Sequence, residues 1–293
     1  MSISTDSFVL LNRFLIASSP FLKGDYMDSE EKKIVGMEVK IPDCIDKTVE
    51  NLAAPVAKSV GTTLSDLWYV VFGKISVIAE KKRILHAKAL EQFKNNLDQR
   101  IEAIPEDKRI MPDTQVVCGA LEDSRFCVDK DELRTMFENL IVSSLNSDTT
   151  NDVHPSFSGF IRHMTCADAR MLARFKESER LPVVNYHYNT KNGGILDAYR
   201  NVITPSQDGL ELKSESSSLN CLQALGLISV VYDKWFLDES AYTALVTAPF
   251  FEKLKSTVSS PPEDFREASG MGYEKGIAFL TDLGKQFVAI CFS

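Results

Sequence analysis

The sequence has few of the residues that build common catalytic, metal and disulfide sites. Histidine occurs only four times in 293 residues, and no two histidines have the spacing of a zinc-protease helix. The six cysteines are scattered rather than regularly spaced. We therefore expect reduced thiols and no disulfide framework.

The chain also lacks a long apolar run. Its most apolar stretch, 64–79, is shorter than a bilayer span and contains Asp66 and Lys74. No basic run precedes the apolar segment near the start, so a secretory signal is not expected. We predict a cytoplasmic protein without a transmembrane segment.

Positive charge is in the minority. Lys and Arg number 33 against 41 Asp and Glu, which gives a formal net charge of -8. The chain as a whole therefore repels nucleic acid and anionic membrane, and only a local basic patch would reverse this. Hydrophobic residues make up 44%, which is ordinary for a globular protein with a packed core.

Recognisable catalytic motifs are absent. Ser269 lies beside Gly270 and Gly272, but no lysine and hydroxyl follow at the spacing that grips phosphate. His163 and Cys166 are three residues apart and could share a metal ion, although a capped histidine and a buried thiol explain them better. We expect no enzyme activity, no catalytic or metal-binding residue and no cofactor.

Apolar periodicity is the strongest positive signal. From Thr48 onward, apolar residues recur every three or four positions as far as a stop near Pro105, which is typical of amphipathic helix. The pattern predicts one long helix or two in line, with Gly61 as a joint between a short helix and a longer one.

Capping residues predict further helices. Asp113 is placed to cap a short helix, and Thr165 with Asp168 is placed to cap a later one. Asp129 with Glu132 three residues on resembles a capping box in which aspartate replaces the usual hydroxyl. Each start is followed by apolar residues at helical spacing, so these segments should pack into one core.

The residue pattern changes after Leu181. The segment 183–188 favours a strand, 192–194 is a turn signal, and 206–218 is polar enough to predict a loop. The other expected elements are a short helix stopped by Gly226, a strand over 228–232, partial helix over 242–251, a returning strand over 276–279, and a final helix capped by Thr281.

These patterns predict a mainly α (α+β) fold. We expect an N-terminal extension over 1–47, a helical domain over 48–180, and a smaller mixed domain over 181–293.

Three helical pieces between Cys127 and Phe175 form an ordered pattern. They are Glu132, Leu133, Phe137 and Leu140 on one helix, His154, Pro155 and Phe157 at the start of the next, and Asp168, Ala169 and Leu172 at the start of a third. The pattern resembles the Abi-alpha family of bacterial proteins associated with abortive infection. With its upstream pieces, the resemblance covers most of 48–180.

The resemblance implies an anti-phage role in bacteria, in which an infected cell stops growing or dies before the virus completes its cycle. It does not imply an enzyme, because the family supplies no established catalytic residues.

The C-terminal pattern is similar to the end of a winged-helix module, in which a helix stops at glycine, two strands form the wing and another helix follows. DNA reading by such a module needs cations, yet no Lys or Arg occurs between Lys213 and Lys234. From Leu181 onward, 9 Lys and Arg face 13 Asp and Glu, a net charge of -4. A protein contact is therefore the better prediction for this end.

A possible interaction surface lies in the first helical stretch. Its aromatic members Trp68, Tyr69 and Phe72 would form a partner groove or oligomer seam, although the protein's own core is the favoured place for them. Its basic members are Lys81, Lys82, Arg83 and Lys88, with acidic residues nearby that favour a solvated surface.

The predicted function is an anti-phage protein that acts through a protein partner or as a homo-oligomer. Two alternatives stay open: a nucleic-acid-binding regulator that uses the C-terminal module, and a membrane-active effector that uses the apolar helix.

Overall fold

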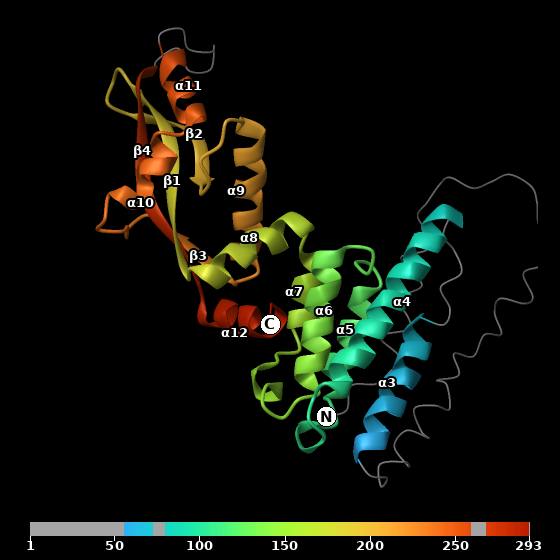
Figure 1. Ribbon diagram of the computed structural model, residues 1–293. Helices are drawn as coiled ribbons and strands as arrows, with labels where there is room; N and C mark the ends of the chain where they lie inside the picture. Colours follow the sequence, from blue (N-terminus) through green and yellow to red (C-terminus); the bar gives the residue numbers. More distant parts are fainter. Residues whose placement is uncertain (1–55, 73–79, 259–267, 293) are drawn as a thin grey trace, which may run out of the picture. The chain divides into compact units, whose positions relative to one another are not determined.

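The computed structural model describes residues 56–72, 80–258 and 268–292 (Figure 1). The expected extension over 1–47 lies outside the described residues. The first part of the described chain is helical and the second part combines a sheet with helices, so the mainly helical α+β fold class is confirmed.

The helical part contains six α-helices and two short 3-10 turns in the described residues. They are α3 (Val56–Phe72), α4 (Glu80–Glu102), the turn Glu106–Lys108, α5 (Thr114–Ser124), α6 (Asp131–Ser144), the turn Thr150–Asp152, α7 (Phe157–His163) and α8 (Cys166–Glu177).

Helices α3 and α4 lie beside each other, so the expected arrangement of one helix or two in line is wrong. The ring centroids of Trp68 and Phe72 lie 5.4 Å and 6.5 Å from that of Phe93. In one continuous helix, Phe72 and Phe93 would be about 30 Å apart along the axis. The two apolar faces pack on each other, which removes both from water. Gly61 lies within α3 and is not a joint.

Three of the four expected caps are confirmed. The Thr281 hydroxyl accepts a hydrogen bond from the Gly284 backbone N–H at 2.9 Å at the start of α12. The Asp113 carboxylate accepts a hydrogen bond from the Gln115 backbone N–H at 2.8 Å. Thr165 and Asp168 form a reciprocal capping box at the start of α8. The expected cap at Asp129 is wrong, because α6 begins after Lys130 without a side-chain cap. Glu132 instead accepts a hydrogen bond from Arg170 of α8 at 2.6 Å, so a tertiary contact replaces the local one.

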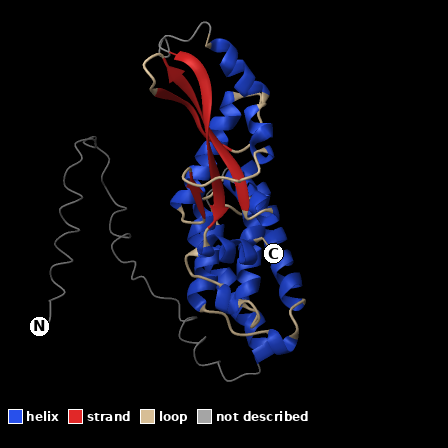
Figure 2. Ribbon diagram, turned by 90° about the vertical axis from the view of Figure 1, so that its left-hand side faces the viewer, coloured by secondary structure: helices blue, strands red, loops and turns tan. Residues whose placement is uncertain are grey.

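The strands, red in Figure 2, form an antiparallel sheet. Their order is β2-β1-β4-β3. The strands are β1 (Arg180–Thr190), β2 (Ile195–Val202), β3 (Ile228–Val231) and β4 (Ala268–Leu280). The turn between β1 and β2 has Gly193 at a φ of 79°, a conformation that glycine adopts without strain. β2 has no counterpart among the expected elements.

The helices of this part are α9 (Gly209–Ala224), α10 (Ser240–Val246), α11 (Pro249–Thr257) and α12 (Asp282–Cys291). The expected loop over 206–218 is wrong, since most of it belongs to α9. Asp208 caps this helix by accepting from the Leu210 N–H, and Leu212 and Leu219 give it a narrow buried side. The helix ends as expected before Gly226, whose φ is 74°.

β3 pairs with β4, although α10 and α11 separate the two strands in the chain, and α12 follows β4. They belong to a sheet with two further strands, and the winged-helix resemblance itself stays a prediction.

The main hydrophobic core includes residues of every α-helix from α3 to α9, of β3 and β4, and of α12. A second cluster joins β1 and β2 to α10 and α11, where the Tyr186 hydroxyl donates to the Leu245 carbonyl at 2.6 Å. Helix α12 is fastened to α6 by Asn139, whose side chain donates to the Cys291 carbonyl at 2.7 Å. The domain division at 180 stays a prediction, and the described residues all belong to one compact unit.

In the described part of the chain, no helix combines the length and apolarity needed to cross a membrane.

Candidate functional site

The aromatic residues expected at an interaction surface separate in the structure. Phe72 is buried, and Trp68 is half-buried with its ring centroid 4.5 Å from that of Phe72. Tyr69 is 79% exposed. Trp68 and Phe72 therefore belong to the packing between α3 and α4, and only Tyr69 of the three is freely available to a partner.

The basic residues expected at this surface lie on α4. Lys88 is exposed. Lys81, Lys82 and Arg83 fall within the bounds of α4, but their side chains lie outside the described part. Tyr69 and Lys88 are the expected members whose described side chains are exposed, and the interaction surface itself stays a prediction.

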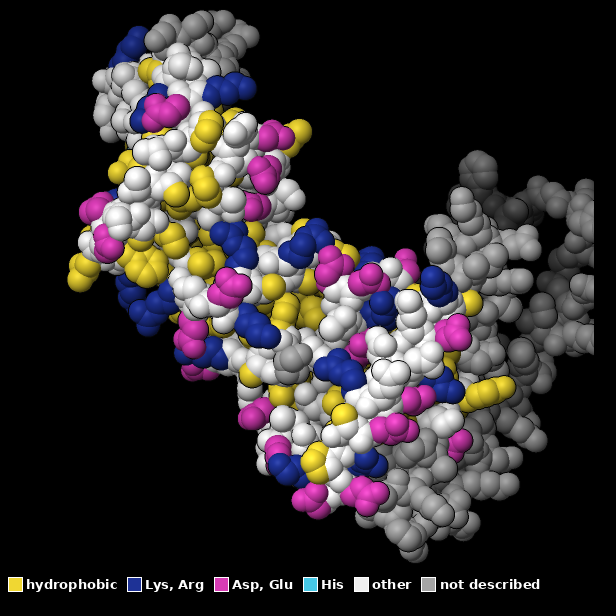
Figure 3. Space-filling view, viewed as in Figure 1, with side chains coloured by type: hydrophobic (Ala, Val, Ile, Leu, Met, Phe, Trp, Pro, Cys, Tyr) yellow, Lys and Arg dark blue, Asp and Glu magenta, His cyan; other side chains and the backbone are white. Residues whose placement is uncertain are grey.

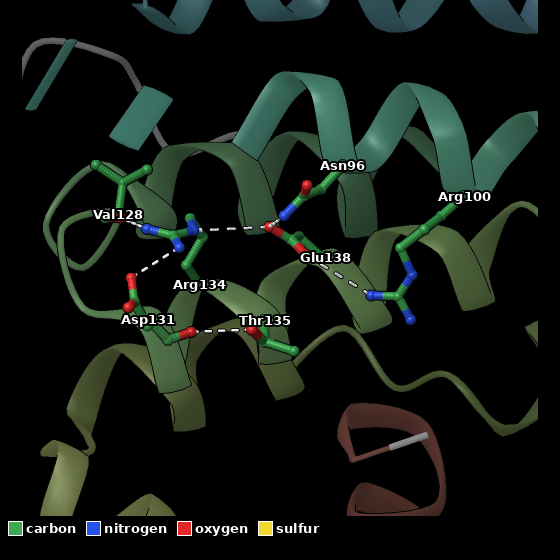
Figure 4. Close-up of polar contacts among 7 residues, drawn as sticks. All are labelled: Asn96, Arg100, Val128, Asp131, Arg134, Thr135 and Glu138. Atoms are coloured by element: carbon green, nitrogen blue, oxygen red, sulfur yellow. Dashed lines mark hydrogen bonds and ion pairs between the residues drawn. The ribbon is translucent and has the colours of Figure 1, made fainter. Parts of the chain in front are cut away.

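A partly buried ionic network joins α4 to α6 (Figure 4). Glu138 of α6 is 3% exposed and accepts a hydrogen bond from the Asn96 amide of α4 at 3.0 Å. A guanidinium nitrogen of Arg100 lies 3.7 Å from Glu138, and Nε of Arg134 lies 3.7 Å from it on the other side. Burial raises the pKa of Glu138, and its polar neighbours only partly oppose this effect.

Two of the three guanidinium nitrogens of Arg134 have close partners. Its Nη1 donates to the Val128 carbonyl at 3.0 Å, and its Nη2 lies 2.7 Å from the Asp131 carboxylate. Its buried Nε has no hydrogen-bond partner. We refer to Asn96, Arg100, Asp131, Arg134 and Glu138 as the α4–α6 network. This network supplies contact between two helices and contains no nucleophile or metal-ligand set.

A second polar group, the sheet network, takes one residue from each of β1, β2 and β4 and one that follows β3. The Tyr232 hydroxyl donates to the Asn201 side-chain oxygen at 2.7 Å, and the Asn201 backbone N–H donates to Asn185 at 3.0 Å. Asn185 in turn donates to Glu274 at 3.0 Å. Burial raises the pKa of Tyr232 well above its usual value. The hydroxyl therefore stays protonated and acts as a donor.

Asn201 has a φ of 56°, in the left-handed region that few residues other than glycine adopt. Its side chain also donates to Asn220 of α9 at 2.9 Å. The sheet network thus fixes the irregular end of β2 and attaches α9 to it, which is a scaffold role.

Two large apolar side chains stand exposed on residues 233–238, between β3 and α10. Trp235 is 52% exposed and Leu237 is 95% exposed. Figure 3 shows hydrophobic side chains gathered over this part of the surface. We call residues 233–238 the apolar loop.

The apolar loop is held in place from beneath. Phe236, between the two exposed residues, donates its backbone N–H to the Tyr242 hydroxyl at 3.0 Å. That hydroxyl donates to the Gly276 carbonyl of β4 at 2.9 Å. At the end of the loop, Asp238 accepts from the Ser240 N–H at 2.9 Å. The backbone at Phe236, between the exposed Trp235 and Leu237, is therefore hydrogen-bonded to α10 and through it to β4.

The structure also places the cysteines and the other potential metal ligands among the described residues. The five cysteines among the described residues are free thiols, as expected. Burial raises the pKa of Cys166, and a hydrogen bond to Glu132 adds to this, which disfavours the reactive thiolate. No group of three or more potential metal ligands occurs in the described ranges.

Sequence reasoning missed both the α4–α6 network and the apolar loop. Arg134 and Glu138 have the i,i+4 spacing of an ordinary surface ion pair, and nothing local reveals that α4 covers them. The loop had a usable signal, since a Trp-Phe-Leu run between charged residues is unusual in a segment that is not a regular element.

Together, the fold and these sites define a mainly helical α+β protein with an exposed apolar loop and two polar networks. Its sequence matches the family model for abortive infection alpha (Abi_alpha) over residues 85–291, and the chain belongs to that family. The matched range starts within α4 and includes the whole sheet and α12.

No curated protein matches the chain. Among solved structures, an uncharacterized protein from the hydrocarbon-degrading marine bacterium Alcanivorax borkumensis SK2 aligns at 15% sequence identity. The alignment covers 50% of this chain and 96% of that chain, with a TM-score of 0.29.

Proposed function

We propose that this member of the abortive infection alpha family acts in phage defence by binding a protein partner through the apolar loop, and not by catalysis. The observation that carries the proposal is the exposure of Trp235 and Leu237 on a backbone that the fold holds fixed.

Two physical quantities favour this proposal: the apolar area that a partner would bury, and the order that the loop already has before binding. Full burial of one large apolar side chain contributes about 1.5–3 kcal/mol, and tryptophan is enriched among the residues that dominate protein interfaces. A loop that is already ordered loses little conformational freedom on binding. The exposed carboxylates of Asp233 and Asp238 flank the pair and outnumber the exposed Lys234 of the same loop, which disfavours anionic membrane or nucleic acid as the ligand.

The test is the efficiency of plating of a phage panel on cells that express the protein. We expect a Trp235→Ser/Leu237→Ser variant to lose protection, because it removes the exposed apolar area and leaves the half-buried Phe236 in place. The matched control is Leu210→Ser, which removes a side chain that is 74% exposed on α9.

Equal expression and equal melting temperature of the three proteins would show that the loss is not unfolding. Full protection by the double variant would rule out the apolar loop as the partner site. Equal loss in the Leu210→Ser control would mean that apolar exposure in general, and not this loop, supports protection.

A further inference from the structure

We propose that two copies of this chain pair along one edge of β4, so that each copy adds its β4 to the sheet of the other. The proposal uses residues separate from the apolar loop and goes beyond the proposed function.

One side of β4 lacks a neighbouring strand over most of its length. β3 pairs with β4 only from Ile277 to Leu280, whereas β1 pairs along the whole strand. Within the described residues, the stretch 268–276 therefore has no strand on the side away from β1. We call residues 268–274 the open edge. All of them except Ala268 are exposed or half-buried, so another strand can reach them.

Hydrogen bonds at the end of β4 show which backbone groups face which side. The Leu280 N–H donates to the Glu179 carbonyl, on the β1 side, at 3.2 Å. The Thr281 N–H donates to the Leu227 carbonyl, on the β3 side, at 3.0 Å. Backbone groups alternate between the two sides along a strand, so the odd-numbered residues of β4 direct theirs away from β1.

Met271 and Tyr273 are the odd-numbered residues nearest the centre of the open edge. The register between β1 and β4 has no shift from Gly270 to Phe279, so the alternation includes both residues. In the described part of the chain, no backbone or side-chain group bonds to their outward N–H and C=O groups. An extended strand is the ligand that supplies an acceptor and a donor to both residues at this spacing.

The other edge of the sheet, at β2, is less suited to pairing. The register between β1 and β2 shifts on both sides of Tyr186, and the exposed side chains of Asp197 and Arg200 form an ion pair on the strand. Irregular pairing and exposed charge discourage the addition of a strand. Glu274 is the one charged residue of the open edge, and it accepts a hydrogen bond from Asn185 of β1 at 3.0 Å.

A second copy of the open edge is a complementary partner. In an antiparallel pair with a two-fold axis at Met271, every outward donor meets an outward acceptor of the other copy. The whole open edge fits, because β3 occupies this side of β4 only from Ile277 onward. No like charges face each other across the pair. The facing residues are Tyr273 with Ser269, Gly272 with Gly270, and Glu274 with Ala268.

Sedimentation equilibrium of the full chain between about 1 and 100 μM is the first test. Pairing of one short strand buries less area than a standard protein interface, so we expect a dimer with a dissociation constant in the micromolar range. A chain that stays monomeric over this range overturns the proposal.

Met271→Pro removes an outward N–H and leaves the hydrogen bonds between β4 and β1 in place. Because each copy loses one hydrogen bond, we expect the dimer to be weakened at least about tenfold. The matched control is Ile195→Pro, which removes an N–H on the outer side of β2 and should dimerise like the wild type. A dimer that ignores Met271→Pro, or that Ile195→Pro weakens equally, overturns the assignment to β4.

Exchange of charge at Met271 gives a test that needs no proline. Met271→Lys and Met271→Glu each place two like charges beside the axis, so each variant alone should be monomeric. An equal mixture should dimerise, because opposite charges then face each other. Circular dichroism confirms that both variants are folded. A mixture of two folded variants that stays monomeric overturns the proposal.

Hydrogen exchange of the wild-type chain distinguishes strand pairing from contact through another surface. When the monomer is concentrated into the dimer, the N–H groups of Met271 and Tyr273 should become protected. Those of Gly272 and Glu274 already face β1 and should change little. Exchange at Met271 and Tyr273 that is equal in monomer and dimer places the contact elsewhere and overturns the proposal.

Discussion

The α4–α6 network and the sheet network are both polar and only partly buried, but their polar groups are satisfied to different degrees. The sheet network joins its members through hydrogen bonds of 2.7–3.0 Å, and Asn201 contributes both its backbone and its side chain. The α4–α6 network relies on charges, two of its contacts are 3.7 Å long, and one buried nitrogen lacks a hydrogen bond.

This difference distinguishes a network that fixes one arrangement from a network that tolerates substitution. A polar network with matched donors and acceptors stabilises one arrangement, because any alternative leaves buried groups without partners. Buried charges with long contacts recover only part of the free energy lost when they leave water. Other side chains at these positions can therefore stabilise the protein equally well. We therefore expect the sheet region to tolerate little change and the α4–α6 region to tolerate more.

The largest expected effect is that of Gly276→Ala in the sheet region. An added Cβ would lie 2.4 Å from the Val231 carbonyl oxygen and 2.7 Å from the Tyr232 ring. The substitution should displace Tyr232 from Asn201 and lower the free energy of unfolding by about 3 kcal/mol, the upper end of overpacking effects. Urea denaturation measures the change.

Gly159→Ala is the matched control, because Gly159 lies in α7 and an added Cβ meets nothing within 4 Å. Replacing glycine by alanine within a helix should stabilise the protein by about 0.5–1 kcal/mol. A Gly276→Ala variant as stable as wild type would show that the sheet network adjusts easily, and the proposed contrast would fail.

A smaller effect is expected for Asn201. Asn201→Ala places alanine in the left-handed conformation and leaves the Tyr232 hydroxyl without its acceptor, so we expect a loss of about 2 kcal/mol. Asn201→Gly removes the same hydrogen bonds but relieves the backbone, so its loss should be about half as large. If the two variants have equal melting curves, the positive φ of Asn201 stores no strain.

The contrast also explains what the sequence could reveal. The helix starts at Asp113 and Thr165 were predictable because a cap and its partner lie within three residues of each other. Glu138 was not, because Asn96 lies 42 residues earlier in the chain and no local pattern connects the two.

The other wrong or missed elements also depend on contacts that no local sequence pattern records. Apolar spacing continues from α3 into α4, but it does not record whether the chain turns back, although Gly73 directly after Phe72 is a signal for a helix end. In α9, the serine-rich segment 214–218 masks a helix whose buried side is narrow. β2 alternates weakly in polarity, and its place depends on the turn that pairs it with β1.

The smallest effect is expected for Glu138→Gln in the α4–α6 network. Glutamine can still accept from Asn96, and Arg134 keeps Asp131, so the loss in free energy of unfolding at neutral pH should not exceed about 1 kcal/mol. The substitution should also change the pH dependence. Because burial raises the pKa of Glu138 above its ordinary 4.5, the folded chain binds a proton more readily than the unfolded chain does.

The wild type should therefore gain stability relative to Glu138→Gln as the pH falls from neutral through the raised pKa of Glu138, and the gain should level off near the ordinary value. Urea denaturation of both proteins between about pH 4.5 and 7 measures this difference. A loss of about 3 kcal/mol or more at neutral pH would mean that the α4–α6 network is as strongly coupled as a well-satisfied buried pair. In that case α4 would be as firmly fixed as the sheet, and the distinction between the two regions would disappear.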